Sequence, residues 1–234
     1  GGAAICLKLI AKYLNRDKYL PIITTPHDDE DYRSYKAVAE WFHIRQSYLN
    51  MQEFQGKLPA KVLSIIDYLV NLIPYVVKIY LLARREGVGL IHLNNEPVCN
   101  MAGVIVAKML RVPCISHVRG AVSWDSKTTR WFYRNVDYYV AVAEWVKKRI
   151  VQLGVPENKV QALGDGRVLD EFLAPFDIQK TRRELGLLEN QLAVGIIGLL
   201  IPWKGHRVFI EAAKILSEEF PETKFFIIGK SPKK

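Results

Sequence analysis

The chain has 234 residues, half of them hydrophobic, and a formal net charge of +9. This length accommodates one large hydrophobic core or two smaller ones. A charged fraction of 24% excludes a wholly disordered chain. The three cysteines, Cys6, Cys99 and Cys114, form no CxxC pair, so we expect reduced thiols and a cytoplasmic location.

The first half alternates short β-branched segments with segments that have helical spacing of apolar residues. These patterns predict helices over 2–15, 27–42, 59–86 and 101–110, and strands over 19–25, 44–49, 88–95 and 112–120. The most apolar segment, 62–83, has an uncharged run of only ten residues, 68–77. Because a membrane span needs about 20 apolar residues, we expect a buried helix there, or two helices broken at Pro74.

The second half continues the alternation. The patterns predict helices over 126–135, 144–154, 181–186 and 204–220, and strands over 136–143, 159–163, 192–198 and 224–230. The strands lack strict polar alternation, which is typical of a parallel sheet covered on both faces. We therefore expect an α/β fold with a Rossmann-like domain over 1–172 and the incomplete beginning of a second one over 173–234. A first strand before Gly1 is expected to lie outside the chain.

In open parallel sheets, ligands bind outside the carboxyl ends of the strands. Asn94 and Asn95 follow one predicted strand, and His117 and Arg119 lie at the end of another. His117 is a candidate base, hydrogen-bond donor or packing residue. The default interpretation of His92 is a structural histidine.

A second candidate site is the loop between the predicted strand ending at Gly198 and the following helix. Lys204 and Gly205 lie at the start of that helix, where unpaired N–H groups and the helix dipole favour an anion. The alternative is that Lys204 is a solvated loop charge. Gly1 and Gly2 precede a predicted helix, which is typical either of a loop against a diphosphate or of a cloning remnant.

Basic residues recur along the chain, so nucleic acid, an anionic membrane surface or a phosphorylated ligand would each suit the net charge. Solvated helix faces account for most such runs. We expect no nucleic-acid partner, because no recognition motif is present. The sequence also shows no metal-ligand spacing, no GxSxG motif and no Walker motif, and we expect no metal.

Five segments, in order along nearly the whole chain, carry a resemblance to one family. They are GGA at the start, GLIHLNN (89–95), VPCISHVRG (112–120), the long segment 138–172, and GIIGLLIPWKGHRVFIEAAKIL (195–216). The chain resembles the GT-B glycosyltransferases, specifically the retaining family-four group that uses nucleotide sugars. The last two segments are long and carry most of the resemblance.

The resemblance implies two Rossmann-like domains, with the nucleotide sugar mainly on the second and the acceptor mainly on the first. Lys204 would bind the donor diphosphate, and Gly198 and Gly205 would shape its loop. Gly2 would approach the same diphosphate or the acceptor. The main catalytic contribution would then be positively charged side chains that stabilise the departing diphosphate. The resemblance implies no metal cofactor and no protein nucleophile.

On the first domain, the resemblance places His117 near the transferred sugar. The strand-end positions of Asn94, Asn95 and Arg119 put these residues on the acceptor side. The acceptor would be a glycan or a lipid-linked molecule in polysaccharide or glycoconjugate biosynthesis. Because the chain is basic, we expect a peripheral protein at the inner face of an anionic membrane.

The chain departs from the family pattern at several positions. Leu199 replaces an arginine that would be a second diphosphate cation, Asp165 replaces an asparagine, and Ala143 replaces a serine. The family's E-x7-E segment would lie beyond Lys234, so we expect the 234 residues alone to transfer no sugar. The alternative functions are a non-catalytic glycosyltransferase-like binding subunit and, on fold alone, a sugar-nucleotide epimerase.

Overall fold

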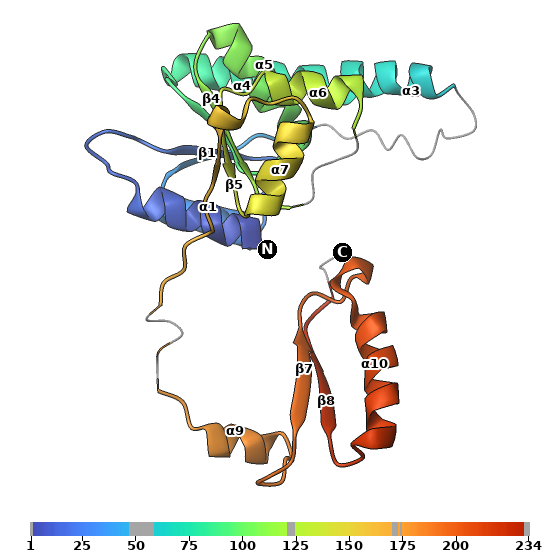
Figure 1. Ribbon diagram of the computed structural model, residues 1–234. Coiled ribbons are helices and arrows are strands. Elements are labelled where there is room, and N and C mark those ends of the chain that lie inside the picture. Colours follow the sequence, from blue (N-terminus) through green and yellow to red (C-terminus); the bar gives the residue numbers. More distant parts are fainter. Residues whose placement is uncertain (1, 47–58, 121–124, 170–172, 174, 232–234) are drawn as a thin grey trace. The chain divides into compact units, whose positions relative to one another are not determined.

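The computed structural model describes residues 2–46, 59–120, 125–169, 173 and 175–231. The chain divides into two compact units, Gly1–Arg167 and Val168–Lys234 (Figure 1). All pairings among the described strands are parallel, and helices alternate with them. This confirms the predicted α/β fold class. The predicted boundary between 172 and 173 adjoins residues outside the described part, 170–172 and 174, and stays a prediction.

The first unit begins with helix α1 (Gly2–Tyr13) and strand β1 (Ile22–Thr25). Helix α2 (Glu30–Arg33) and the 3-10 turn η1 (Ser34–Ala37) follow, and strand β2 (Glu40–His43) pairs in parallel with β1. A small core fixes this part of the unit. Ala11, Ile23 and Tyr35 are buried together, so α1, β1 and η1 share one cluster.

Two predictions in this region are wrong. The helix expected over 27–42 ends early, because 40–43 form β2, and 44–46 form no strand. Residues 47–49 of the second prediction lie outside the described part. The reason is non-local: Glu40 pairs with Ile22, and the Trp41 indole donates to Thr25 Oγ1 at 3.0 Å. These contacts with β1 override the helical spacing of the segment.

The apolar segment forms one continuous helical element rather than two broken helices. Helix α3 (Ala60–Asp67) runs into the π-helical turn η3 (Tyr68–Leu72) and then into α4 (Ile73–Arg85), with Pro74 in the first turn of α4. One face packs on α5 (Met101–Leu110), where Val76 and Ala83 are buried against Ala102. The expectation of a buried helix is wrong, since the opposite face is exposed. By length and composition, Ile65–Arg85 would also suffice to cross a membrane.

A four-stranded parallel sheet, in the order β3-β4-β5-β6, forms the centre of the first unit. Its strands are β3 (Ile91–Leu93), β4 (Cys114–Val118), β5 (Tyr138–Ala141) and β6 (Val160–Ala162). Short turns η4 (Pro97–Asn100) and η5 (Glu157–Lys159) lie in the connections, with helices α6 (Lys127–Arg134) and α7 (Glu144–Gln152). Figure 1 shows α4, α5 and α6 on one side of the strands and α1 on the other.

The largest core lies around this sheet. Tyr133 and Tyr139 are fully buried and stacked with ring centroids 5.7 Å apart, and the Tyr139 hydroxyl donates to the Tyr133 carbonyl. The Tyr133 hydroxyl donates to Glu96 at 2.7 Å. Because each buried hydroxyl has a partner, the core gains aromatic packing without an unsatisfied polar group. This core fixes the sheet whose carboxyl edge carries the candidate site.

The second unit contains α9 (Ile178–Glu184), β7 (Ala193–Ile197), η6 (Pro202–Lys204), α10 (His206–Glu219) and β8 (Lys224–Ile228). Strands β7 and β8 pair in parallel, as a βαβ arrangement requires. Among the described residues of this unit, only Leu187 is buried. The loop between β7 and α10 is therefore held mainly by local contacts.

Candidate active site

The carboxyl edge of the central sheet gathers polar side chains from distant parts of the first unit. Asn94 and Asn95 directly follow β3, His117 lies within β4, and Arg119 follows the end of β4. Because β3 and β4 are parallel neighbours, their carboxyl ends lie at the same edge. The sequence-predicted acceptor-side residues are thus brought close to His117.

Arg119 connects this group. Its side chain is only 6% exposed, and its Nε donates to both carboxylate oxygens of Asp165 at 3.1 and 3.2 Å. Nη1 donates to the backbone carbonyl of Asn94 at 3.0 Å and also to the Asn94 side-chain oxygen. The guanidinium has a compensating carboxylate and several acceptors, so its burial costs far less than that of a lone charge.

His117 is held by the same arginine. Arg119 Nη2 lies 2.9 Å from His117 Nδ1, and since a guanidinium only donates, Nδ1 is the acceptor. The neutral ring therefore carries its proton on Nε2. That nitrogen is buried and has no hydrogen-bond partner among the described residues, with Asp165 Oδ1 3.4 Å away. His117 presents a hydrogen-bond donor, because its acceptor nitrogen is already occupied.

The electrostatic surroundings keep His117 neutral. Burial and the neighbouring Arg119 charge lower the pKa of His117 to about 4, although Asp165 opposes the shift. Burial, with smaller contributions from His117 and Arg119, also lowers the pKa of His92 to about 4. The two rings lie 6.1 Å apart between centroids. A general-base role for His117 at neutral pH is disfavoured, because Nδ1 is engaged and the imidazole is a weak base here.

The start of α1 adjoins this cluster. The Asn94 side-chain amide donates to the Ala3 carbonyl at 3.0 Å, and the Tyr35 hydroxyl donates to the Ala4 carbonyl at 3.1 Å. A Cβ placed on Gly2 would meet no atom within 4 Å, so open space surrounds it. The first turn of α1 thus lies beside Asn94, and an anion at its start would meet the N–H groups that a helix leaves without intrahelical partners.

Cys6 was not predicted as a site residue. It is 3% exposed, and burial raises the pKa of its thiol, with Asp165 adding to the shift. Asp165 follows the predicted strand 159–163 and departs from the family's asparagine, and it is the carboxylate that pairs with Arg119. Complementary charge at two strand ends was the available signal for Asp165, whereas nothing in the sequence pattern singles out Cys6.

The second unit holds the other predicted residues in one loop. Lys204 ends η6 and is exposed, and Gly205 precedes α10 with φ of +77°. A Cβ on Gly198 would lie 3.8 Å from the Lys204 side chain, so the lysine stem runs past this glycine. Left-handed backbone at Gly205 suits glycine because it has no Cβ. Gly198, Lys204 and Gly205 are therefore neighbours, and the Lys204 ammonium is accessible to an anion.

His206 holds this loop and was not predicted. Its Nε2 lies 2.8 Å from the Leu199 carbonyl, which can only accept, so Nε2 carries the proton. The other nitrogen, Nδ1, is buried with no hydrogen-bond partner among the described residues. Leu199, in the place of the family's arginine, contributes a backbone carbonyl here and no charge.

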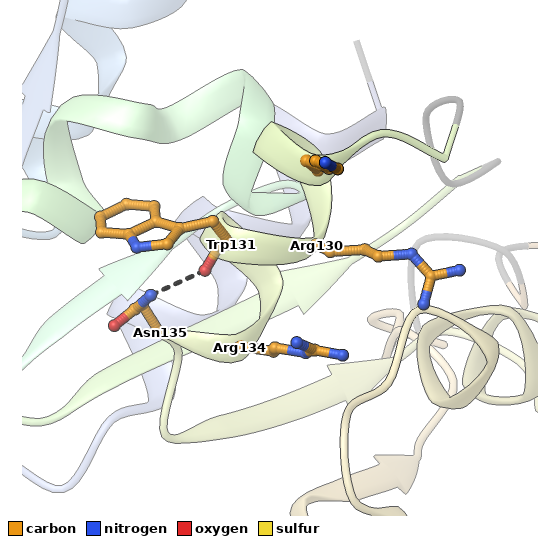
Figure 2. Close-up of a pocket in the computed structure, with 5 residues that line it drawn as sticks. Arg130, Trp131, Arg134 and Asn135 are labelled. Carbon is orange, nitrogen blue, oxygen red and sulfur yellow. Dashed lines mark hydrogen bonds between the residues drawn. The ribbon is translucent and has the colours of Figure 1, made fainter.

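The basic residues of α6 line a separate, open pocket. Figure 2 shows Arg130, Trp131, Arg134 and Asn135 on this helix, and Lys127 completes the lining. Arg130 pairs with Asp125 at 2.5 Å, and the Asn135 side chain donates to the Trp131 carbonyl. The residues that line this pocket lie on and just after α6, which connects β4 to β5, and not at the carboxyl edge of the sheet. Its lining includes none of the sequence-predicted site residues.

The fold and the clustered polar edge define a Rossmann-like α/β protein of the GT-B class. The chain belongs to Glycosyltransferase Family 4, whose domain model matches residues 1–169. This match includes Gly2, Asn94, Asn95, His117, Arg119 and Asp165. The predicted family is thereby confirmed.

Three known proteins illustrate the similarity. An Escherichia coli UDP-Gal:alpha-D-GlcNAc-diphosphoundecaprenol alpha-1,3-galactosyltransferase is 24% identical over 168 residues, 65% of this chain and 43% of that protein. Anabaena HepE, solved with UDP and glucose, has a TM-score of 0.73 at 22% identity, over 99% of this chain and 58% of that one. A Neisseria meningitidis UDP-GlcNAc 2-epimerase, bound to UDP-GlcNAc, has a TM-score of 0.56 at 16% identity, over 97% of this chain and 62% of that one.

The chain thus spans about half the length of these relatives. The two structural similarities lie below 25% identity and concern the fold alone. The epimerase shares that fold, which is why fold alone does not separate transfer from epimerisation. The family match over residues 1–169 rests on sequence rather than on fold.

Proposed function

We propose that the protein is a retaining glycosyltransferase that moves a sugar from a nucleotide diphosphate donor to a glycan or a lipid-linked acceptor. The observation that carries the proposal is the buried donor at His117 Nε2, held by Arg119 at the carboxyl edge of the sheet. The Asp165 carboxylate, 3.4 Å from Nε2, compensates this N–H only in part, and a ligand hydroxyl at hydrogen-bond distance would satisfy it. The relative from Escherichia coli, whose name specifies a UDP-galactose donor and a lipid diphosphate substrate, supports this substrate class.

In the proposed reaction, the bond between the sugar C1 and the donor diphosphate oxygen breaks. A bond from C1 to the acceptor oxygen forms on the same face, and the acceptor proton passes to the departing diphosphate. The exposed Lys204 ammonium would bind that diphosphate and stabilise its developing charge. His117 would donate to the transferred sugar, and Asn94, Asn95 and Gly2 would border the acceptor. We propose that no metal cofactor takes part.

Nucleotide-sugar binding by the full-length protein tests this proposal. Calorimetry with UDP-glucose, UDP-galactose and UDP-GlcNAc should find one preferred donor, and UDP release should require an acceptor such as a GlcNAc-diphospho-lipid analogue. The coupling constant at the anomeric carbon of the product reports retention. Turnover that persists unchanged in EDTA supports a metal-independent reaction, and the 234 residues alone should give no turnover. Failure to bind any nucleotide sugar overturns the proposal.

A second candidate function is a non-catalytic glycosyltransferase-like subunit. Leu199 favours it, because the loop after β7 supplies one side-chain cation, Lys204, where the family pattern has two. This alternative predicts nucleotide-sugar binding without UDP release on any acceptor. We propose a cytoplasmic location for either function, which the three free cysteines support.

A further inference from the structure

The helix formed by α3, η3 and α4 carries a continuous exposed apolar surface. Its residues recur at intervals of three or four, and we name them the apolar ridge: Val62, Ile65, Leu69, Ile73, Val77 and Leu81. Their exposed fractions range from 39% to 60%. At 1.5 Å per residue the ridge is about 28 Å long. Exposed aliphatic surface on this scale marks an interaction site rather than scattered surface residues.

The π-helical turn keeps this ridge on one face. Spacing of four residues drifts around a regular α-helix, because one turn takes only 3.6 residues. The wider turns of η3, over Tyr68–Leu72, rotate less per residue and offset part of the drift. Within η3, Asn71 is buried and donates to the Asp67 carboxylate at 2.6 Å. The ridge is thus a feature of the helix geometry as well as of composition.

The opposite face of the helix is fixed to the domain. Val76 and Ala83 pack on α5, and the Lys78 ammonium donates to the Arg45 carbonyl at 3.0 Å. Because the part of the helix from Leu72 to Ala83 packs on α5, that part presents only its free face to an apolar environment. This arrangement favours a helix lying in the plane of a membrane surface over one that crosses it.

The basic residues near the ridge indicate which partner binds to it. Between residues 59 and 85 the single acidic residue is Asp67, which accepts from Asn71, whereas Lys78, Arg84 and Arg85 are exposed. Arg85 is paired with Glu86, and the Lys78 ammonium is bonded to the Arg45 carbonyl. The remaining cation, Arg84, donates to the Tyr80 hydroxyl and makes no salt bridge within the described part. A symmetric dimer through the ridge would bring like charges together, whereas anionic lipid headgroups complement them.

The same helix layer adds further positive charge. Right-handed crossovers and Figure 1 place α6 on the same side of the sheet as α4 and α5. Helix α6 carries Lys127, Arg134 and the half-exposed Trp131. Indole rings are favoured at membrane interfaces, and each cation near an anionic surface adds to the attraction. We propose that the apolar ridge inserts into the headgroup region of an anionic bilayer and holds the protein at its surface.

Vesicle co-sedimentation of the full-length protein tests this inference. The probe is a set of vesicles containing 30% phosphatidylglycerol in phosphatidylcholine, compared with pure phosphatidylcholine. The double variant Leu69→Gln, Leu81→Gln removes two ridge residues that are 56% and 60% exposed. We expect its affinity for the anionic vesicles to fall by about tenfold or more, and wild-type binding to weaken on neutral vesicles. The matched control is Leu20→Gln, at a residue 84% exposed outside the ridge, which should bind as the wild type does.

Several results would overturn the inference. One is a double variant that binds anionic vesicles as tightly as the wild type and has an unchanged thermal melting curve. A second is a wild type that does not bind anionic vesicles. A third is a dimer in light scattering that the double variant abolishes, and a fourth is vesicle-bound protein that alkaline carbonate does not extract, which indicates a spanning helix. The inference depends on the proposed function in one respect: a lipid-linked acceptor would give the protein a reason to lie at a membrane. Vesicle binding is measured without sugar transfer, so turnover on a soluble acceptor distinguishes failure of one from failure of the other.

Discussion

Arg119 and Asp165 form an ion pair across 46 residues of sequence, in which the Arg119 Nε–H is shared between the two carboxylate oxygens at 3.1 and 3.2 Å. The pair joins the end of β4 to the segment after β6. The same guanidinium contacts Asn94 and His117. The family pattern has asparagine where Asp165 stands, so this chain compensates a buried arginine with a full charge.

Removal of that compensation should destabilise the first unit. Asp165→Ala leaves the Arg119 guanidinium, which is 6% exposed, without a counter-charge. We expect the free energy of unfolding to fall by about 2–4 kcal/mol, as for other broken buried pairs. Urea unfolding followed by circular dichroism measures the change. Asp165→Asn keeps an acceptor and should lose less.

A matched control uses an exposed pair of the same type. Asp28 accepts from Arg33 Nε at 2.8 Å, but both side chains are exposed, at 38% and 60%. Solvent screens such a pair, so Asp28→Ala should leave the urea midpoint unchanged. If both alanine variants unfold alike, Asp165 contributes no more than a surface charge.

His117 should act as a hydrogen-bond donor that depends on Arg119 for its orientation. His117→Ala removes the Nε2–H group, and we expect kcat/KM to fall by about tenfold, the value of one neutral hydrogen bond. The affinity of the variant for UDP should equal that of the wild type, because UDP lacks the transferred sugar. An equal loss of UDP affinity in calorimetry would contradict a contact with the sugar.

The elements that follow local patterns were predictable from the sequence, and those set by distant contacts were not. Helix α5 occupies 101–110 as predicted, and β4 lies within the predicted 112–120. Strand β2 was missed because its stability comes from pairing with β1 rather than from its own spacing. The apolar segment 62–83 was wrongly expected to be buried, since apolar residues on all sides of a helix do not reveal which face the domain covers.

The site was predictable only at the level of strand ends. The rule for parallel sheets brought Asn94, His117 and Arg119 to one edge, and the structure brings the same three side chains into contact. The strand-end rule also covers Asp165. Its pairing with Arg119 and the tautomer of His117 follow from side-chain geometry, which no local pattern encodes. Whether these residues act on a sugar, and whether Lys204 binds a diphosphate, stay predictions.

Stability of the first unit should fall on acidification, because two histidines are neutral in the folded protein. The pKa of His117 and that of His92 are each lowered to about 4, whereas an unfolded histidine titrates near 6.5. Between these values the unfolded chain binds more protons, so acid favours unfolding. From pH 8 to pH 5 we expect a loss of about 1–2 kcal/mol per histidine.

Urea unfolding across this pH range measures that loss. The variants His92→Gln and His117→Gln should each flatten the profile between pH 7 and pH 5, because glutamine does not titrate. His27 is an exposed histidine, so His27→Gln is the control. A profile that His92→Gln and His117→Gln leave unchanged would show that other groups cause the acid sensitivity.

The loop after β7 should bind a diphosphate with one side-chain cation, and a second one should be installable. Lys204→Ala should weaken UDP binding to the full-length protein by about 1.5–3 kcal/mol, the range for a hydrogen bond to a charged group.

Leu199→Arg places a guanidinium where the family pattern has one, beside the carbonyl that His206 holds. We expect it to tighten UDP binding several-fold, with a steeper dependence on salt. Leu199→Lys separates bidentate recognition from charge alone, since an ammonium lacks the planar fork. Unchanged UDP affinity in both Lys204→Ala and Leu199→Arg, measured by calorimetry, would remove this loop from the donor site.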